Sequence, residues 1–461
     1  MRRVYFIILA VGLLFLSFNL GMTTAGNYPP ETLLDLVNLQ GFEETETVEE
    51  TIDTEDPETP EEPVLEEEKE EEVKEPEPDL RTAKMVTTGN IIAHLLQIHQ
   101  AEIANGEYDF SPSFEVVAPY LQDADLTVGD LEVMQASKDI VSPGNGLTGY
   151  TGYPEFNAPP EFSEALYEAG INIFTLANNH ALDRGLEGLQ MTIEHLRNLG
   201  ASTFGAYLNQ NEHDKPLIIE VDGINIALLG YTYGLNGNVI PRGHEYSVNL
   251  IPDFEDISPI IADIEAARSH GADLVAVFNH WGAETSHEPQ PQRLREIAEE
   301  FVEAGADLII GGHPKYIQPF EWFFFEEEDG SERAALAIYS QGSFISNQHE
   351  GDGFNSIYNE FGLLLDIDIS KNLDSKETWI SGMDYEITWV HREWRHRVLP
   401  VSEVLSSASP KDYNLTGYDF DRLRKIYDFS VDVLNYYNHE EDKARAMAIS
   451  ERLYHKAYDK E

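Results

Sequence analysis

Short apolar runs alternate along residues 84–310 with stretches whose apolar positions recur at helical spacing. The apolar runs predict strands at residues 84–93, 171–177, 202–205, 217–221, 224–230, 274–278 and 308–310, and a strand end at 126–128. The helical spacing predicts helices at residues 160–169, 186–199, 258–269 and 292–304. Asp222 and Gly223 form a hairpin signal between two of the strands. This alternation predicts βαβ units in a largely parallel sheet flanked by helices.

The pattern changes after residue 335. Longer alternating stretches at 335–339, 361–369 and 378–390 predict further strands that complete the sheet structure. Residues 418–458 carry aromatic and charged side chains at helical spacing, and we expect helices that pack on the core. We therefore divide the chain into a main domain over residues 81–405 and a helical extension over residues 406–461.

The first 26 residues have the pattern of a secretory signal or a membrane anchor. Arg2 and Arg3 precede a continuous apolar run from Val4 to Phe18, and Ala25 is a small residue at a suitable cleavage position. Extended to residue 22, the apolar run nearly reaches the about 20 residues that span a bilayer. Both alternatives place the remainder of the chain outside the cytoplasm.

Residues 27–80 are dominated by Glu, Asp, Pro and Thr beyond residue 43, a composition that predicts a disordered, self-repelling linker. The formal net charge of the whole chain is −54. A chain this acidic lacks the basic face that nucleic acid binding requires, and an acidic substrate needs a cation or local basic residues to approach.

The absence of cysteine excludes disulfides, thiolate metal sites and a cysteine nucleophile, so any metal must use nitrogen and oxygen ligands.

Candidate chemistry lies in short polar strings, most of which directly follow a predicted strand. The strings are TTGNIIAH (87–94), GDLE (129–132), LANNHALDRG (176–185), FNHWGAE (278–284) and GGHPKYIQP (311–319). The carboxyl ends of parallel strands meet at one edge of a sheet, where open α/β sheets bind their ligands. We therefore expect the Asn, Asp, Glu and His side chains of these strings to converge on one site.

In their order and spacing these strings, followed by YSQGSFISNQ at 339–348, resemble the CapA/PgsA-type proteins of poly-γ-glutamate capsule biosynthesis. That family is similar to the calcineurin-like metallophosphoesterase superfamily. The resemblance implies a four-layer αββα sandwich, an N-terminal membrane attachment and an extracytoplasmic role in polymer assembly or export. It also implies a divalent metal cofactor (Mn, Mg or Zn) and, as partners, an anionic polymer such as poly-γ-glutamate and membrane-bound synthase subunits.

The resemblance assigns candidate roles residue by residue. His180 would stabilise charge or move a proton, with Asp183 beside it. The candidate metal ligands are Glu132, Asn179, His280, His313 and Asn90. The candidate substrate-binding residues are Asp130, Glu284, Lys315 and Arg184. Structural roles remain open for several of them: a helix cap at 179–183, a core histidine at 280, and surface charge at 184 and 315.

Four positions depart from the family pattern: Asp130 and Ser343 each stand where the family has Asn, and two further changes bear on metal binding. Asn90 replaces the aspartate of the family's GD motif, and Lys315 replaces the second histidine of its HPH motif. The first change removes a negative charge, and the second places an ammonium where an imidazole would bind metal. We expect one ion or none instead of two. The chain is thus either a metal-dependent hydrolase or acyltransferase, or a non-catalytic scaffold that holds polymer for a membrane synthase.

Overall fold

The computed structural model describes residues 79–456, except 290–291, 327–329, 331, 354–355 and 408–412. The predicted anchor over residues 1–26 and nearly all of the predicted linker lie outside the described residues. Within this part of the chain, no helix combines the length and apolar character needed to cross a bilayer.

The predicted strands divide between two sheets, a division that the apolar pattern alone does not reveal. An eight-stranded sheet has the order β16-β15-β14-β1-β4-β5-β6, with β13 also paired to β1. The strands β1, β4, β5, β6 and β13 run parallel, and β14 to β16 are antiparallel. Their bounds are β1 Leu80–Ile91, β4 Leu126–Leu131, β5 Ile173–Thr175, β6 Ser202–Phe204, β13 Ser343–Ile345, β14 Phe361–Asn372, β15 Thr378–His391 and β16 Arg397–Pro400.

The second sheet has six strands in the order β11-β12-β10-β9-β8-β7. Its four central strands are parallel, and its two edge strands are antiparallel. The bounds are β7 Leu217–Val221, β8 Ile224–Thr232, β9 Leu274–His280, β10 Leu308–Gly312, β11 Phe320–Glu326 and β12 Glu332–Ile338. The predicted hairpin joins β7 to β8 through Asp222 and Gly223, both with positive φ, as a two-residue turn between twisted strands requires.

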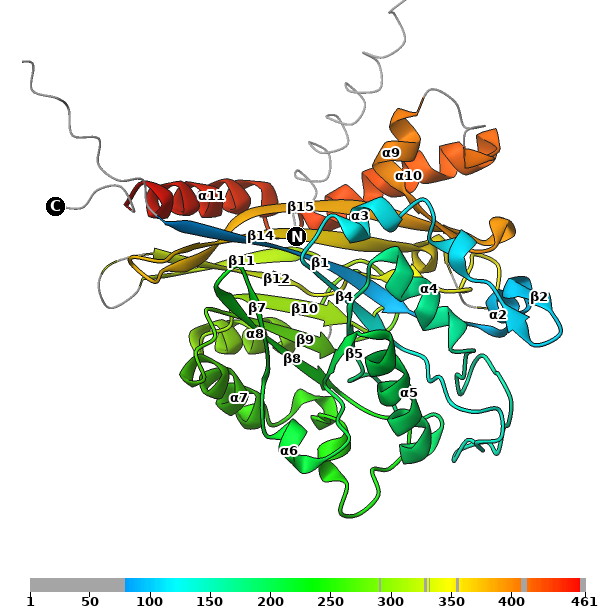
Figure 1. The fold of residues 1–461 in the computed structure, drawn as a ribbon. Coiled ribbons are helices and arrows are strands. Elements are labelled where there is room, and N and C mark those ends of the chain that lie inside the picture. Colours follow the sequence, from blue (N-terminus) through cyan, green and yellow to red (C-terminus); the bar gives the residue numbers. More distant parts are fainter. Residues whose placement is uncertain are drawn as a thin grey trace, which may run out of the picture. The chain divides into compact units, whose positions relative to one another are not determined.

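The two sheets pack face to face around a shared apolar core to which both contribute buried side chains (Figure 1). Helices α4 (Glu161–Ala169) and α5 (Gly185–Leu199) bury their apolar faces in a second cluster with the eight-stranded sheet. Helices α7 (Ser258–Ser269) and α8 (Arg293–Glu303) form a third cluster with the six-stranded sheet. The mixed α/β class predicted from the sequence is confirmed.

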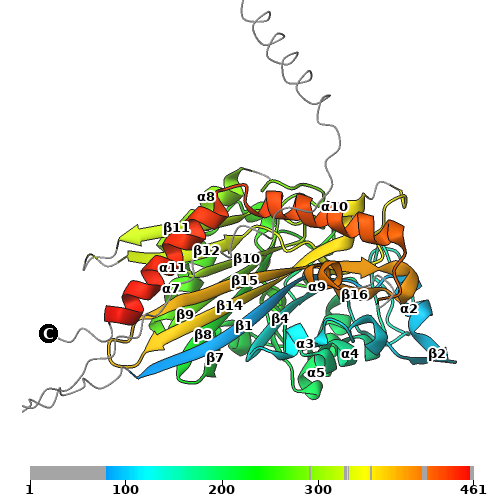
Figure 2. The same ribbon diagram turned by 90° about the horizontal axis from the view of Figure 1, so that it is seen from above.

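The carboxyl-terminal helices pack on the core, as the sequence predicted. Helix α10 (Gly417–Leu434) adds Leu423 and Ile426 to the core between the sheets, and α11 (His439–Lys456) contacts β11, β12 and β15 (Figure 2). The apolar pattern did not predict several short elements. These are α2 Leu95–Ala101, β2 Glu102–Ala104, β3 Glu107–Tyr108, α3 Ala118–Gln122, α6 Gln210–His213, β11, β13, β16 and α9 Val401–Ser406.

The buried His439 at the start of α11 should make stability depend on pH. Trp322 Nε1 donates to His439 Nδ1 at 3.2 Å, and the imidazole stacks on Phe320 with ring centroids 4.5 Å apart. Burial, with a smaller contribution from Lys443, lowers the pKa of His439 to about 4. The folded chain therefore binds fewer protons than the unfolded chain, and this contribution to stability is complete above about pH 6.5 and lost as the pH falls towards 4.

We expect the wild-type free energy of unfolding to fall by roughly 2–3 kcal/mol more than that of a His439→Gln variant between pH 7 and pH 4. Urea unfolding at a series of pH values measures the difference. The matched control is His270→Gln, because His270 is exposed at the end of α7. Parallel pH profiles for the wild type and His439→Gln would contradict the prediction.

Candidate metal centre

Strand ends from both sheets deliver the polar residues of the site. Asn90 lies near the end of β1, and Glu132 follows β4. His280 is the last residue of β9, and His313 follows β10. The register places Asn90 beside Asp130 in one sheet and Gly312 beside His280 in the other. The site therefore lies where the carboxyl ends of two packed sheets meet, and not at the edge of one sheet as the sequence suggested.

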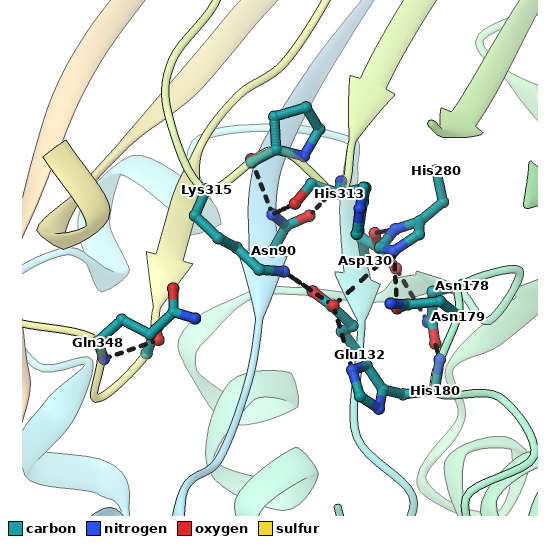
Figure 3. Close-up of polar contacts among 12 residues, drawn as sticks. Asn90, Asp130, Glu132, Asn178, Asn179, His180, His280, His313, Lys315 and Gln348 are labelled. Atoms are coloured by element: carbon teal, nitrogen blue, oxygen red, sulfur yellow. Dashed lines mark hydrogen bonds and ion pairs between the residues drawn. The ribbon is translucent and has the colours of Figure 1, made fainter. Parts of the chain in front are cut away.

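Glu132, His280 and His313 form a buried cluster that could hold a metal ion. One ligand atom from each residue lies within 4.8 Å of the other two, and the residues are 1%, 2% and 7% exposed (Figure 3). Burial lowers the pKa of His313 well below its ordinary value, and the nearby charges of His280 and Lys315 add to this effect. His313 is therefore neutral at physiological pH, which is the form that binds metal.

His280 is oriented by a carboxylate behind it. Its Nδ1 lies 2.8 Å from Asp130 Oδ2, and Asp130 is itself fixed by the Asn178 amide, which donates to Oδ1 at 3.1 Å. If Nδ1 donates its proton to Asp130, the unprotonated Nε2 faces Asn179 Oδ1 at 3.0 Å. Two acceptors this close repel each other unless a proton or a cation lies between them. The carboxylate–histidine arrangement is typical of metal ligands.

The loop that carries His313 is held in a strained conformation. His313 has φ +83°, a value that side chains other than glycine rarely adopt. The Asn90 side chain braces this loop: Oδ1 accepts from His313 N at 3.0 Å, and Nδ2 donates to Pro314 O at 3.1 Å. His313 Nδ1 is buried without a hydrogen-bond partner. Asn90 therefore supports the position of His313, and its assignment as a direct ligand stays a prediction.

Lys315 reaches into the cluster and contacts Glu132. Its Nζ lies 2.8 Å from Oε1 and 2.6 Å from Oε2 of that carboxylate, and both side chains are almost fully buried. Burial alone would raise the pKa of Glu132, but the charges of Lys315 and His280 outweigh burial and lower this pKa below its ordinary value. The Glu132 carboxylate is thus ionised and already forms an ion pair with the Lys315 ammonium.

His180 and Asp183 form a pair at the border of the cluster. His180 Nδ1 lies 2.7 Å from Asp183 Oδ2, which also accepts from Phe156 N at 2.7 Å. His180 Nε2 lies 3.8 Å from Glu132 Oε1, the same distance as His280 Nε2. Asp183 therefore orients His180 so that its other nitrogen faces the Glu132 carboxylate.

Two predicted substrate-binding residues lie outside this cluster. The Arg184 guanidinium is buried and donates to Leu147 O at 3.4 Å and to the Thr151 hydroxyl. The Glu284 side chain is exposed, and its backbone oxygen accepts from Lys315 N at 2.8 Å. Both residues support loops near the site, and their assignment to substrate binding stays a prediction.

Three site residues were not singled out from the sequence. Asn178 fixes Asp130, as described above. Tyr233 packs against His313 with ring centroids 4.7 Å apart and the ring planes tilted by 47°, and Asn236 Oδ1 accepts from Asn179 Nδ2 at 3.2 Å. Asn178 belongs to the LANNH string, and the other two follow the end of β8. All three residues follow a predicted strand, so listing every polar or aromatic residue after the strand ends would have identified them from the sequence.

The residues present fit one divalent cation. The cluster offers a carboxylate, an amide oxygen and two imidazoles, which is a donor set suited to Mn or Zn. An ion bound by His280 Nε2 and Asn179 Oδ1 would account for their close approach. The buried Nδ1 of His313 has no hydrogen-bond partner that would compete with an ion.

The chain is similar in sequence to curated proteins of capsule biosynthesis. The chain is 29% identical over 280 residues to the capsule biosynthesis protein CapA of Bacillus anthracis, covering 60% of this chain and 62% of that protein. It is 28% identical over 248 residues to the PGA biosynthesis protein CapA of Bacillus subtilis (strain 168), covering 51% of this chain and 57% of that protein. The chain thus matches less than two thirds of the length of each relative.

Solved structures with a distant likeness include the NAD nucleotidase of Haemophilus influenzae, with a TM-score of 0.38, 13% identity and coverage of 79% of this chain and 61% of that one. Another is the calcineurin-like phosphoesterase YfkN of Bacillus subtilis, with a TM-score of 0.37, 14% identity and coverage of 67% of this chain and 90% of that one.

Residues 84–348 match the family described as bacterial capsule synthesis protein PGA_cap. The matched region contains every residue of the cluster, from Asn90 to Lys315, and extends over more than half of the chain. The chain belongs to the PGA_cap family of bacterial capsule synthesis proteins.

Proposed function

We propose that the chain acts outside the cytoplasm in the production or export of a poly-γ-glutamate-like capsule polymer, together with membrane-bound synthase subunits. Membership of the capsule synthesis family and the names of the two CapA relatives support this role. Residues 1–26 would attach the chain to the membrane, or release it if they are cleaved near Ala25. The two packed sheets and their outer helices support a four-layer αββα sandwich of the metallophosphoesterase type.

The convergence of Glu132, His280 and His313 with the Asn179 amide carries the proposal of metal-dependent chemistry. A bound divalent ion would act as a Lewis acid on an acyl oxygen of the polymer or on water. Asp130 keeps His280 in the orientation that presents Nε2 to the site. The His180–Asp183 pair can accept or return a proton through His180 Nε2, because Asp183 holds the other nitrogen.

The reaction would be hydrolysis or transfer at the γ-glutamyl amide. Hydrolysis adds water across the amide, so that the acyl carbon becomes a carboxylate and the nitrogen leaves as an amine. Transfer would pass the same acyl group to another nucleophile. Hydrolysis, and transfer to a hydroxyl group, give one new amino group for each bond cleaved, and this group can be measured directly. Transfer to an amine consumes one amino group for each one released, so it is followed by the change in polymer length instead.

A second candidate is a polymer-binding scaffold without catalysis. The contact between Lys315 and Glu132 favours it, because an ammonium already occupies the carboxylate that would otherwise be shared between ions. A scaffold would bind the anionic polymer through one cation and release no product.

The test is an assay of purified full-length protein with poly-γ-glutamate and added Mn, Mg or Zn. We expect metal-dependent release of amino groups, with at least a 100-fold loss in His313→Ala because the cluster loses one of its ligands. The control is His270→Ala, since His270 is exposed on α7. Polymer binding without release would favour the scaffold. Neither binding nor release would contradict both proposals.

A further inference from the structure

The Lys315 side chain is as deeply buried as the candidate metal ligands around it. It is 2% exposed, and its backbone is fixed by the hydrogen bond from Lys315 N to Glu284 O. The preceding Pro314 carbonyl accepts from Asn90 Nδ2 and from the Ser340 hydroxyl, at 3.1 Å and 2.9 Å. A lysine in an ordinary exposed ion pair would have neither this burial nor these hydrogen bonds to the backbone around it.

The ammonium lies against the carboxylate as a bound cation would. Nζ contacts both oxygens of Glu132, and Oε1 of the same carboxylate lies 3.8 Å from His280 Nε2 and from His180 Nε2. Glu132 thus has an ammonium on one side and the imidazoles of the candidate ion site on the other. A carboxylate between two cations is the usual bridge of a two-metal site.

The charges of the cluster agree with one divalent ion beside the ammonium. The acids of the cluster are Glu132, a candidate ligand, and Asp130, which contacts His280, and Lys315 offsets one of their two charges. Asn90, where the family pattern has an aspartate, brings no further negative charge. A second divalent ion on this side of Glu132 would lie at contact distance from the ammonium and be repelled.

We propose that the Lys315 ammonium takes the place of a second divalent cation, so that the centre consists of one divalent ion and one ammonium bridged by Glu132. This inference rests on the proposed metal site. An ammonium carries three donors, and two of them are used on Glu132. The third is left for an oxygen of an anionic acyl or phosphoryl group bound between the two cations.

The test counts bound Mn²⁺ in the full-length protein and in Lys315→His, which exchanges the ammonium for a neutral imidazole. We expect Lys315→His to bind one more ion per chain than the wild type. Two Mn²⁺ ions that share a carboxylate are spin-coupled, so the electron paramagnetic resonance spectrum of the variant should show coupling that the wild-type spectrum lacks. This signal also separates the site from Mn²⁺ bound to exposed acidic residues.

Lys371→Met is the matched control, because Lys371 is also buried and pairs with Asp273 at 2.6 Å, away from the cluster. It should leave the count and the spectrum unchanged. A folded Lys315→His variant with the wild-type count and no coupling would overturn the inference, as would coupled ions in the wild type. The number of Mn²⁺ ions bound by the wild type tests the proposed metal site separately. One ion in the wild type that is lost in His280→Ala would support the site. A wild type that binds no ion dependent on His280 would contradict it.

Discussion

Replacement of His280 by alanine is expected to lower the affinity for Mn²⁺ at least about 100-fold. The variant loses Nε2, which faces Asn179 Oδ1 and lies 3.8 Å from Glu132 Oε1. It also leaves the Asp130 carboxylate without the imidazole that it orients. Loss of an outer residue that orients a ligand costs about 10- to 100-fold in affinity, so loss of the ligand itself should reach at least the upper end of this range.

Isothermal titration of metal-free protein measures this effect, with His195→Ala as the control. His195 is half-buried in α5 and contacts Pro160 O, outside the cluster. The control should keep the wild-type affinity. Equal affinity in His280→Ala and in the wild type would show that His280 does not bind the ion.

Replacement of Gly311 by alanine is expected to destabilise the fold by about 3 kcal/mol or more. A Cβ at this position would lie 1.9 Å from Tyr339 O and 2.8 Å from Trp281 Nε1. The first of these atoms belongs to the backbone of the segment after β12, so the clash cannot be relieved by rotation of a side chain. The close approach between the end of β10 and the segment after β12 therefore requires glycine.

Urea unfolding of Gly311→Ala measures this cost, and Gly234→Ala is the control. Gly234 also lies in a loop beside the site, but a Cβ there would meet no atom within 4 Å. The control should change the free energy of unfolding by less than about 0.5 kcal/mol. A Gly311→Ala protein as stable as the control would contradict the packing described for this loop.

Much of the site followed from one topological rule. His280 and His313 were placed at strand ends because LVAVF and LII are apolar runs followed by polar strings, and the structure has β9 and β10 there. Glu132 and Asn179 follow β4 and β5 in the same way. The rule works because parallel strands share the direction of their carboxyl ends.

The contacts within the site did not follow from the sequence. The sequence predicts that Lys315 binds substrate, and the structure shows its ammonium on Glu132, which is 183 residues away in the chain. The sequence predicts that Asn90 binds metal, and in the structure its side-chain amide hydrogen-bonds to the backbone of His313 and Pro314. Both contacts depend on how two sheets pack, and the apolar pattern of single strands contains no information about the distance between sheets.

The central claim is that Glu132, His280 and His313 hold one divalent ion. Crystals of the protein soaked with Mn²⁺ and measured at the manganese absorption edge test it most directly. We expect a single strong anomalous peak in contact with Glu132 Oε1, an imidazole nitrogen of His280 and one of His313, with Lys315 Nζ still on Glu132. Anomalous peaks confined to exposed acidic residues, with these three side chains ordered and no peak between them, would contradict it.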